Sequence, residues 1–169
     1  MKHFIAVLFL IPFSVAAQEC NLKKEKDHVS LAPRLSTGFF PINAGINRVL
    51  LSIDANNKEI DFFFSLNNGA DSRCFDAAST AVVNFEGERV KVNYKNTGSM
   101  NCEGLFHFTF KNSTATPSAL QRIGAKKISS IVFTGNNKTQ VILPFREEDQ
   151  QQFMKMVNCM ITESKTLIQ

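Results

Sequence analysis

Three aspartates in the middle of the chain have side chains that could do chemistry together. Asp61, Asp71 and Asp76 lie on or beside segments with strand-like patterning. Two carboxyl groups that face each other about 5–10 Å apart across a cleft can serve as acid, base or nucleophile in hydrolysis. Beyond residue 17 the sequence has just two histidines, His28 and His107, which leaves acid–base work to such carboxylates. A hydrolase that uses strand-borne carboxylates is therefore one hypothesis for the function.

A sharper motif overlaps this region. The stretch EIDFFFSLNNGADS, residues 59–72, resembles the active-site strand and turn of retropepsin-like aspartic proteases. In that family an apolar strand runs into Asp-Thr/Ser-Gly-Ala, and here the turn is Asn67-Asn68-Gly69-Ala70. The position of the catalytic aspartate is taken by Asn67, and an amide cannot share a proton with a partner carboxylate or activate a water. The motif is therefore a degenerate one, and an ordinary tight turn accounts for it.

Other catalytic and metal-binding motifs are missing from the sequence. There is no GxSxG, HExxH or phosphate loop. The segment 54–59, DANNKE, has alternating oxygen ligands like a calcium loop, but it lacks the glycine at the sixth position and a ligand at the fifth, so a hairpin loop is the better interpretation. The sequence has no CxxC pair, so its cysteines do not indicate a zinc site. We expect no catalytic, cofactor-binding or metal-binding residues, and the leading hypothesis is a non-enzymatic binding domain or envelope component.

The first 17 residues have the pattern of a secretory signal peptide. Lys2 and His3 precede an apolar run, and Val15 and Ala17 provide the small residues that signal peptidase requires. The run is shorter than the about 20 residues that span a membrane. Lipid attachment at Cys20 would require a small residue just before it, where the chain has a glutamate. The sequence predicts a single exported domain, 18–169, that is soluble in the periplasm or secreted and is not lipid-anchored.

Four cysteines remain after cleavage, and an even number in an exported chain favours two disulfides. Cys74 precedes and Cys102 follows a predicted hairpin over residues 81–94, so closing that hairpin brings the two together. Cys20 then pairs with Cys159 on the last predicted helix, which would tie down the N-terminal end. Three connectivities are possible for four cysteines, and this is the one that we predict.

The charge of the chain is mildly positive and widely spread. The formal net charge is +4 for the whole chain and +3 after residue 17, and the basic residues are scattered except for Lys23-Lys24-Glu25-Lys26. Nucleic-acid-binding proteins concentrate positive charge on one face, so we expect no nucleic-acid partner. A protein or glycan partner remains open, and a protein-binding module would need an exposed apolar patch of more than a few hundred Å². Beyond residue 17 the sequence has no apolar segment long enough to predict a membrane span.

Alternating apolar residues predict three β-hairpins. The first joins residues 49–54 to 60–66, and the third joins 128–133 to 139–145 across Gly135-Asn136-Asn137. In the second, a type II′ turn with Gly87-Glu88 as its loop residues would place Val83 opposite Val92, Ala81 opposite Tyr94 and Phe85 opposite Val90.

A further strand and two helices complete the predicted elements. In the strand GLFHFTF three phenylalanines share one face, which puts His107 on the other. Thr116 is the predicted N-cap of a short helix that Gly124 ends. A last helix opens at Glu147-Glu148-Asp149 and carries one apolar stripe. The members of that stripe are Phe153, Met156, Val157 and Met160.

Together these elements predict an α+β fold: a mostly antiparallel sheet built from hairpins, with a short helix and a C-terminal helix packed on a sheet face. Three features are similar to those of small, uncharacterised exported proteins of Gram-negative bacteria: MNCEG before the phenylalanine-rich strand, LQRIGAKKISSIVF, and a final helix ending in Cys159. The resemblance implies an envelope or secreted protein and carries over no catalytic residue.

Overall fold

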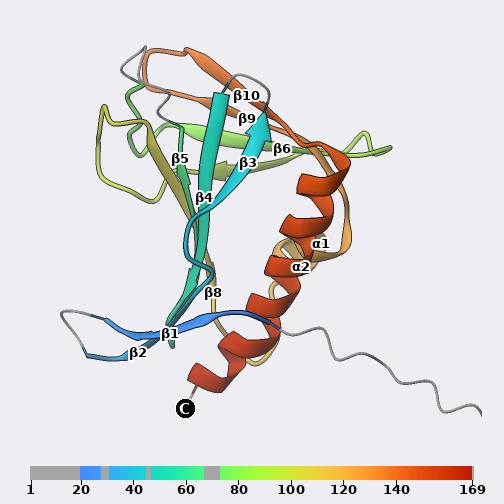
Figure 1. Ribbon diagram of the computed structural model, residues 1–169. Helices are drawn as coiled ribbons and strands as arrows, with labels where there is room; N and C mark the ends of the chain where they lie inside the picture. The colour runs from blue at the N-terminus through green and yellow to red at the C-terminus, as the bar shows by residue number, and fades with distance from the viewer. Residues whose placement is uncertain (1–19, 28–30, 45–46, 67–72, 169) are drawn as a thin grey trace, which may run out of the picture.

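Within residues 20–27, 31–44, 47–66 and 73–168, which the structure describes, ten strands form two antiparallel sheets in a computed structural model (Figure 1). The first sheet has the order β1-β2-β4-β5-β8, and β3 also pairs with β4. The second sheet has the order β10-β9-β6-β7. The strands of the first sheet are β1 (Lys23–Lys26), β2 (Pro33–Ser36), β3 (Phe40–Ala44), β4 (Asn47–Ala55), β5 (Glu59–Ser65) and β8 (Leu105–Lys111). Those of the second are β6 (Thr80–Phe85), β7 (Val92–Lys95), β9 (Ile128–Thr134) and β10 (Gln140–Pro144).

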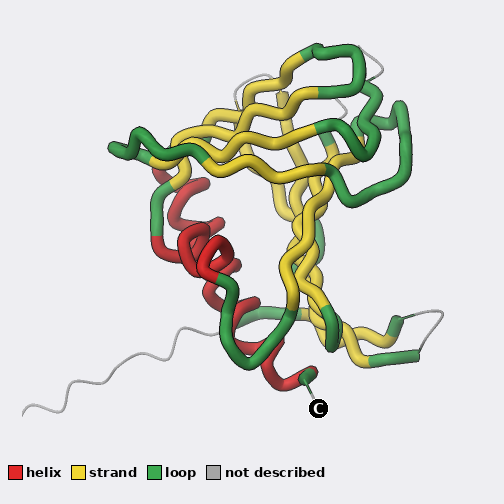
Figure 2. Tube along the Cα trace, turned by 180° about the vertical axis from the view of Figure 1, so that it is seen from behind, coloured by secondary structure: helices red, strands yellow, loops and turns green. Residues whose placement is uncertain are grey.

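The helices occupy the corner between the two sheets. They are α1 (Ser118–Ala125) and α2 (Glu147–Glu163), and a short 3₁₀ turn, η1 (Ser164–Leu167), follows α2. Seen from behind, the second sheet lies across one end of the first, and both helices lie beneath it (Figure 2). The fold class is therefore the predicted one, mostly antiparallel sheet with a C-terminal helix, although the strands divide into two sheets.

Phenylalanine rings join the two sheets and α2 into one core. Phe133 of β9 contacts both Phe64 of β5 and Phe106 of β8, with ring centroids 5.1 Å and 5.2 Å apart. Phe153 of α2 contacts Phe62 of β5 at 6.0 Å. All of these side chains are at most 1% exposed. The alternation in β5 and β8 explains this arrangement, because every second residue of these strands faces the core.

The predicted hairpins are confirmed, with one correction to a turn. Val83 pairs with Val92 and Ala81 with Tyr94, as predicted. The turn, however, lies one residue earlier: the Glu88 amide donates to the Phe85 carbonyl, which makes Glu86 and Gly87 the central residues. Gly87 adopts φ +71°, which glycine tolerates without steric cost. The predicted opposition of Phe85 and Val90 is not part of the ladder, since β7 begins only at Val92.

The short helix also differs from its prediction. Pro117 is its N-cap residue, and no side chain caps that end, so Thr116 does not have the predicted role. Gly124 lies inside the helix, which ends at Ala125. Its position is explained by packing: the Asn158 side chain of α2 donates to the Gly124 carbonyl at 2.8 Å, and a Cβ at this position would lie 2.7 Å from Asn158 Oδ1. The glycine permits close approach of the two helices and does not stop α1.

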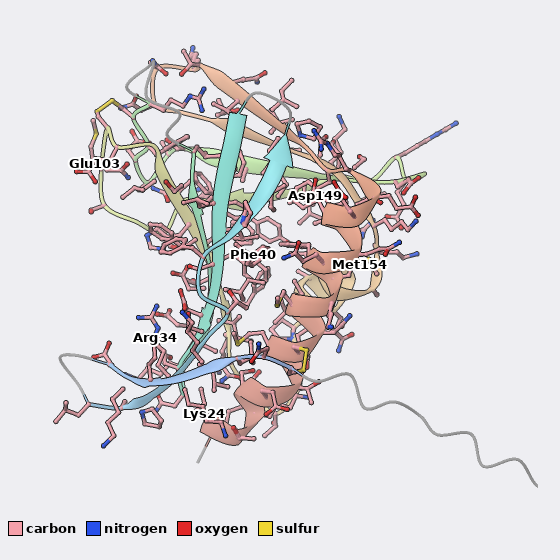
Figure 3. The ribbon with its side chains drawn as sticks, viewed as in Figure 1. Lys24, Arg34, Phe40, Glu103, Asp149 and Met154 are labelled. Carbon is pink, nitrogen blue, oxygen red and sulfur yellow. A yellow bond between two sulfur atoms is a disulfide. The ribbon has the colours of Figure 1, made fainter. Side chains whose placement is uncertain are left out.

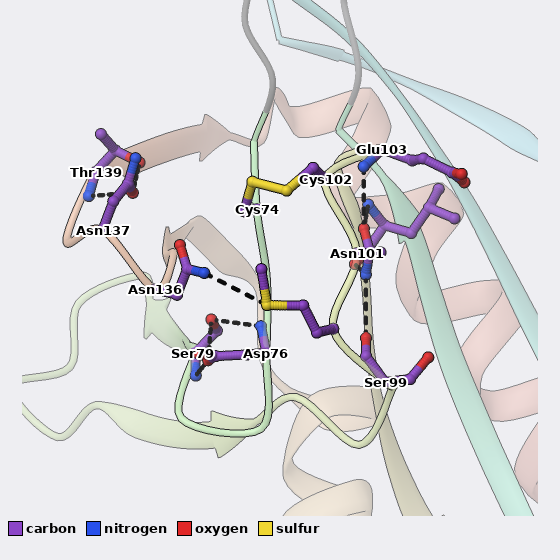
Figure 4. Close-up of a disulfide and its surroundings, with 12 residues drawn as sticks. Cys74, Asp76, Ser79, Ser99, Asn101, Cys102, Glu103, Asn136, Asn137 and Thr139 are labelled. Carbon is purple, nitrogen blue, oxygen red and sulfur yellow. Dashed lines mark hydrogen bonds between the residues drawn. A yellow bond between two sulfur atoms is a disulfide. The ribbon is translucent and has the colours of Figure 1, made fainter.

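Two disulfides join Cys20 to Cys159 and Cys74 to Cys102, which is the pairing predicted from the sequence. The first joins the segment before β1 to Cys159 in the C-terminal half of α2, with Cα atoms 5.5 Å apart. The second links the segments that flank the β6–β7 hairpin (Figure 4). Beside it, Phe75 and Asn101 form an isolated antiparallel bridge with backbone hydrogen bonds of 2.8 Å and 2.9 Å. The crosslink therefore reinforces a pairing that the backbone already makes.

Candidate functional site

The face of the first sheet that points away from the core carries a group of polar side chains. Strand pairing places Ser52, Phe63 and His107 in one row across β4, β5 and β8. The next row contains Asp54, Asp61 and Thr109. Residues directly opposite each other on one face have Cβ atoms about 4.5–5.5 Å apart. The register alone therefore brings two aspartates together.

His107 has two side-chain neighbours at one of its ring nitrogens. Its Nδ1 lies 3.2 Å from Asp61 Oδ1 and 3.3 Å from Thr97 Oγ1. The Asp61 carboxylate can only accept, so Nδ1 carries a proton, and this hydrogen bond raises the pKa of His107 above its ordinary value. The ring also packs on Gly98, where a Cβ would lie 2.7 Å from His107 Cδ2. The side chain is 28% exposed, in keeping with the predicted placement of His107 on the face opposite the phenylalanines.

The arrangement around His107 differs from that of a nucleophilic triad. A triad places the carboxylate on one ring nitrogen and the nucleophile's hydroxyl on the other. Here Asp61 and Thr97 both approach Nδ1. The Thr97 hydroxyl donates to the His107 carbonyl oxygen at 3.2 Å, so its proton is not directed to the imidazole. The three side chains attach the loop after β7 to β8, and they are not arranged to transfer a proton from a nucleophile.

Asp54 is the most buried charged side chain on this face. It is 8% exposed, and its Oδ2 accepts from Arg34 Nη2 at 2.9 Å and from Ser52 Oγ at 3.0 Å. Its Oδ1 is buried and has no hydrogen-bond partner. A buried acceptor of a charged group that lacks a partner costs free energy of folding. Asp54 is therefore held at this position at a cost that Arg34 and Ser52 offset only in part.

A cleft of about 490 Å³ opens beside these aspartates, between the β1–β2 and β4–β5 hairpins. Arg34, on β2, is one of the residues that line this cleft (Figure 3). Four acidic and two basic side chains line it, a formal excess of two negative charges in a chain whose net charge is +4. The lining residues are Asp27, Ala32, Arg34, Asp54, Ala55, Asn56, Asn57, Lys58, Glu59 and Asp61.

The β4–β5 connection forms one wall of the cleft and has the predicted hairpin form. Asn56 Oδ1 accepts from the backbone amides of Lys58 and Glu59 at 2.8 Å and 3.0 Å, a turn in which the side chain satisfies its own loop. In the part of the chain that is described, no group of three or more histidine, cysteine, aspartate or glutamate side chains is placed to hold a metal ion.

Of the three aspartates proposed as hydrolytic carboxylates, the structure describes Asp61 and Asp76, and each is bound by different groups. Asp61 is paired with His107. Asp76 lies in a turn at the start of the second sheet, where its Oδ1 accepts from the Ser79 hydroxyl and amide and the Ala78 amide, each at 2.9 Å (Figure 4). The Ser79 hydrogen bond lowers the pKa of Asp76 below its ordinary value. Asp71 and the whole Asn67–Ala70 motif lie outside the described residues, as does His28.

Sequence reasoning missed Arg34 and Asp54 as site residues. The signal for Asp54 was present in the first hairpin, because its register places Asp54 opposite Asp61, and like charges directly opposite each other destabilise a sheet. Arg34 carried no such signal, since its strand pairs with β4 only through Leu35 and Ser36.

No family model, curated protein or solved structure matches the chain. Among the described residues, no helix has both the length and the apolar character that crossing a membrane requires. The signal peptide predicted over residues 1–17 lies outside the described part of the chain. The site must therefore be interpreted from its own geometry.

Proposed function

We propose that this protein is an exported binding domain, not an enzyme, and that it holds a small polar ligand in the cleft between the β1–β2 and β4–β5 hairpins. One observation carries the proposal: Asp54 is 8% exposed at the wall of the cleft, and one of its carboxylate oxygens has no partner. Sequences that break a local rule of folding tend to do so at functional sites. A positively charged ligand in the cleft would offset part of the cost through its attraction to this carboxylate.

The size and support of the cleft favour a ligand site. Its volume of about 490 Å³ falls in the range of about 300–1,000 Å³ that small-molecule sites occupy. Asp54, Asp61 and Arg34 all project from paired strands, and sites on regular elements are held more precisely than sites on loops.

Export is supported by the cysteines and by the N-terminal pattern. All four cysteines are joined in disulfides, and disulfides persist in oxidising compartments outside the cytosol. The signal-like residues 1–17 agree with such a location. A non-enzymatic role is supported by the geometry around His107, where the hydroxyl and the carboxylate share one ring nitrogen.

A ligand screen tests this function. Residues 18–169, with both disulfides formed, are titrated with four compound classes: amines, amino acids, neutral sugars and dicarboxylates. The measurement is the set of backbone amide shifts. We expect at least one class to shift the amides of residues 54–61, and Asp54→Ala to abolish the effect.

The matched control is Glu103→Ala, because Glu103 is exposed and well separated from Arg34 along the molecule (Figure 3). This variant should bind like the parent. The proposal fails if no class perturbs the cleft. It also fails if a panel of hydrolase substrates reveals turnover that disappears when one polar residue is changed.

A further inference from the structure

We infer that the ligand of this cleft is an organic cation with N–H donors, such as a primary amine, seated against Asp54 and Asp61. The inference rests on the proposed function, since it assigns the chemistry of the same cleft. It depends on three features of the described residues: the acid excess, the opposed aspartates and the oxygens that have no donor.

The first feature is charge complementarity. The cleft has a formal excess of two negative charges, although the chain as a whole carries +4. A cleft lined mostly by one sign of charge raises the local concentration of the opposite ion. A cation is therefore favoured over an anion.

The second feature is the pair of aspartates directly opposite each other on β4 and β5. Like charges at such positions destabilise a sheet. Arg34 and His107 each contact one member of the pair: Arg34 contacts Asp54 Oδ2, and His107 contacts Asp61 Oδ1. A cation in the cleft would interact with both carboxylates at once.

The third feature is the set of acceptors that these partners leave. Asp54 Oδ1 is buried with no hydrogen-bond partner, and no described residue donates to Asp61 Oδ2. Asp61 Oδ2 is an acceptor on a side chain that is 26% exposed, so a donor in the cleft can reach it. Asp54 Oδ1 is buried, so the charge of that donor stabilises it without a direct hydrogen bond. An ammonium or guanidinium group provides both the charge and the N–H donors, whereas a quaternary ammonium provides the charge alone.

A bare metal ion fits the cleft less well than an organic cation. Calcium takes 6–8 oxygen ligands, and among the described residues no cluster of three or more acidic, histidine or cysteine side chains is arranged around a common point. The volume of about 490 Å³ also exceeds what an ion needs and leaves room for a carbon chain.

Four probes of one chain length separate charge from hydrogen bonding. They are 1,5-diaminopentane, its hexamethylated bis-quaternary analogue, 1,5-pentanediol and pentanedioate. Each is titrated into residues 18–169 with both disulfides intact, and binding is followed by calorimetry and by amide shifts. We expect diaminopentane to bind most tightly, and its affinity to fall as salt is raised, because exposed charges are screened. The quaternary analogue should bind at least about tenfold more weakly, since it lacks the hydrogen bonds to charged oxygens.

Isosteric variants test the two aspartates. Asp61→Asn, which removes the accepting carboxylate, and Asp54→Asn, which removes a negative charge beside the ligand, should each weaken diaminopentane binding by about tenfold or more. Glu103→Gln removes the same charge far from the cleft and should change the affinity by less than about twofold, in line with the weak effects of distant exposed charges. Circular dichroism of each variant establishes that it is folded. If one aspartate variant does not fold, the other variant alone tests the inference.

The outcomes distinguish this inference from the function on which it rests. If pentanediol or pentanedioate binds in the cleft as well as diaminopentane does, the inference is wrong but the binding function stands. If none of the four probes binds, the inference is wrong, and the function is then decided by the wider screen. If diaminopentane binds equally well to both aspartate variants, it does not occupy this site, and the inference is again wrong.

Discussion

Removing the Cys20–Cys159 disulfide should destabilise the protein more than removing Cys74–Cys102. The two crosslinks close very different lengths of chain, with sequence separations of 139 and 28 residues. A crosslink restricts the unfolded chain, and its effect grows with the logarithm of the loop length. For these separations the entropic contribution at 25 °C is about 5 kcal/mol and about 3.6 kcal/mol, both as upper estimates.

The assay compares two double variants, Cys20→Ala/Cys159→Ala and Cys74→Ala/Cys102→Ala, by equilibrium urea unfolding. Alanine suits the buried position 159, where the side chain is 6% exposed. Both cysteines of a pair are replaced so that no free thiol remains. The difference between the two variants should be about 1–2 kcal/mol. For a chain of this size that corresponds to a melting temperature lower by about 2–8 °C in the first variant.

The reverse order would refute the reasoning. If loss of the short loop costs more than loss of the long one, the crosslinks act mainly through contacts in the folded state. The isolated Phe75–Asn101 bridge beside Cys74 would then be the first candidate for the missing stabilisation.

Three further variants test individual contacts. Asp61→Asn should lower the pKa of His107 toward the ordinary value of 6.5, as measured by NMR titration. In the parent protein the raised pKa of His107 stabilises the folded state below pH 6.5, and this contribution is lost as pH rises through the folded-state pKa. The stability of the variant should therefore fall less steeply above pH 6.5. An unchanged slope would show that Asp61 does not raise the pKa of His107. Gly124→Ala should cost at most about 1 kcal/mol in urea unfolding, because its Cβ displaces the Asn158 side chain from its hydrogen bond while alanine favours the helix by about 0.5–1 kcal/mol. A cost above about 3 kcal/mol would mean that the Asn158 side chain cannot move aside. Phe133→Ala should cost about 3–5 kcal/mol because this ring joins the two sheets, and a loss below about 1 kcal/mol would show that the sheets are held together elsewhere.

Much of the fold was predictable because its strands follow local rules. Alternation over residues 60–66 and 105–110 identified which side chains face the core, and the register of the second hairpin followed from matching apolar positions. The disulfide pairing followed from the same hairpin, since closing it brings Cys74 and Cys102 together. These inferences need only the strand period and the geometry of a turn.

Other features depended on contacts between elements distant in sequence. Gly124 looked like a helix stop because glycine is common there, but its place is decided by Asn158, 34 residues later. The division of the strands into two sheets also has no local signal, because β6 pairs with β9 and the elements β7, β8 and α1 lie between them in the sequence. The turn at Gly87 was misplaced by one residue because glycine suits a positive φ at either central position of a turn.

The candidate site was only partly visible in the sequence. Asp61 stood out as a carboxylate on a strand, and His107 was correctly placed on the face opposite the phenylalanines. Their contact required the pairing of β5 with β8, which no turn connects directly. Arg34 enters through the β1–β2 hairpin, whose docking on the end of β4 involves only two residue pairs. Such a short pairing leaves no periodic pattern to detect.

A crystal structure of residues 18–169 with 1,5-diaminopentane tests the central claim most directly. The account predicts an ammonium nitrogen in the cleft within about 2.7–3.2 Å of Asp61 Oδ2, with the same group beside the Asp54 carboxylate. Arg34 should remain on Asp54 Oδ2, as it is in the free protein. A diamine bound elsewhere on the molecule, with the cleft holding only water, would contradict the account.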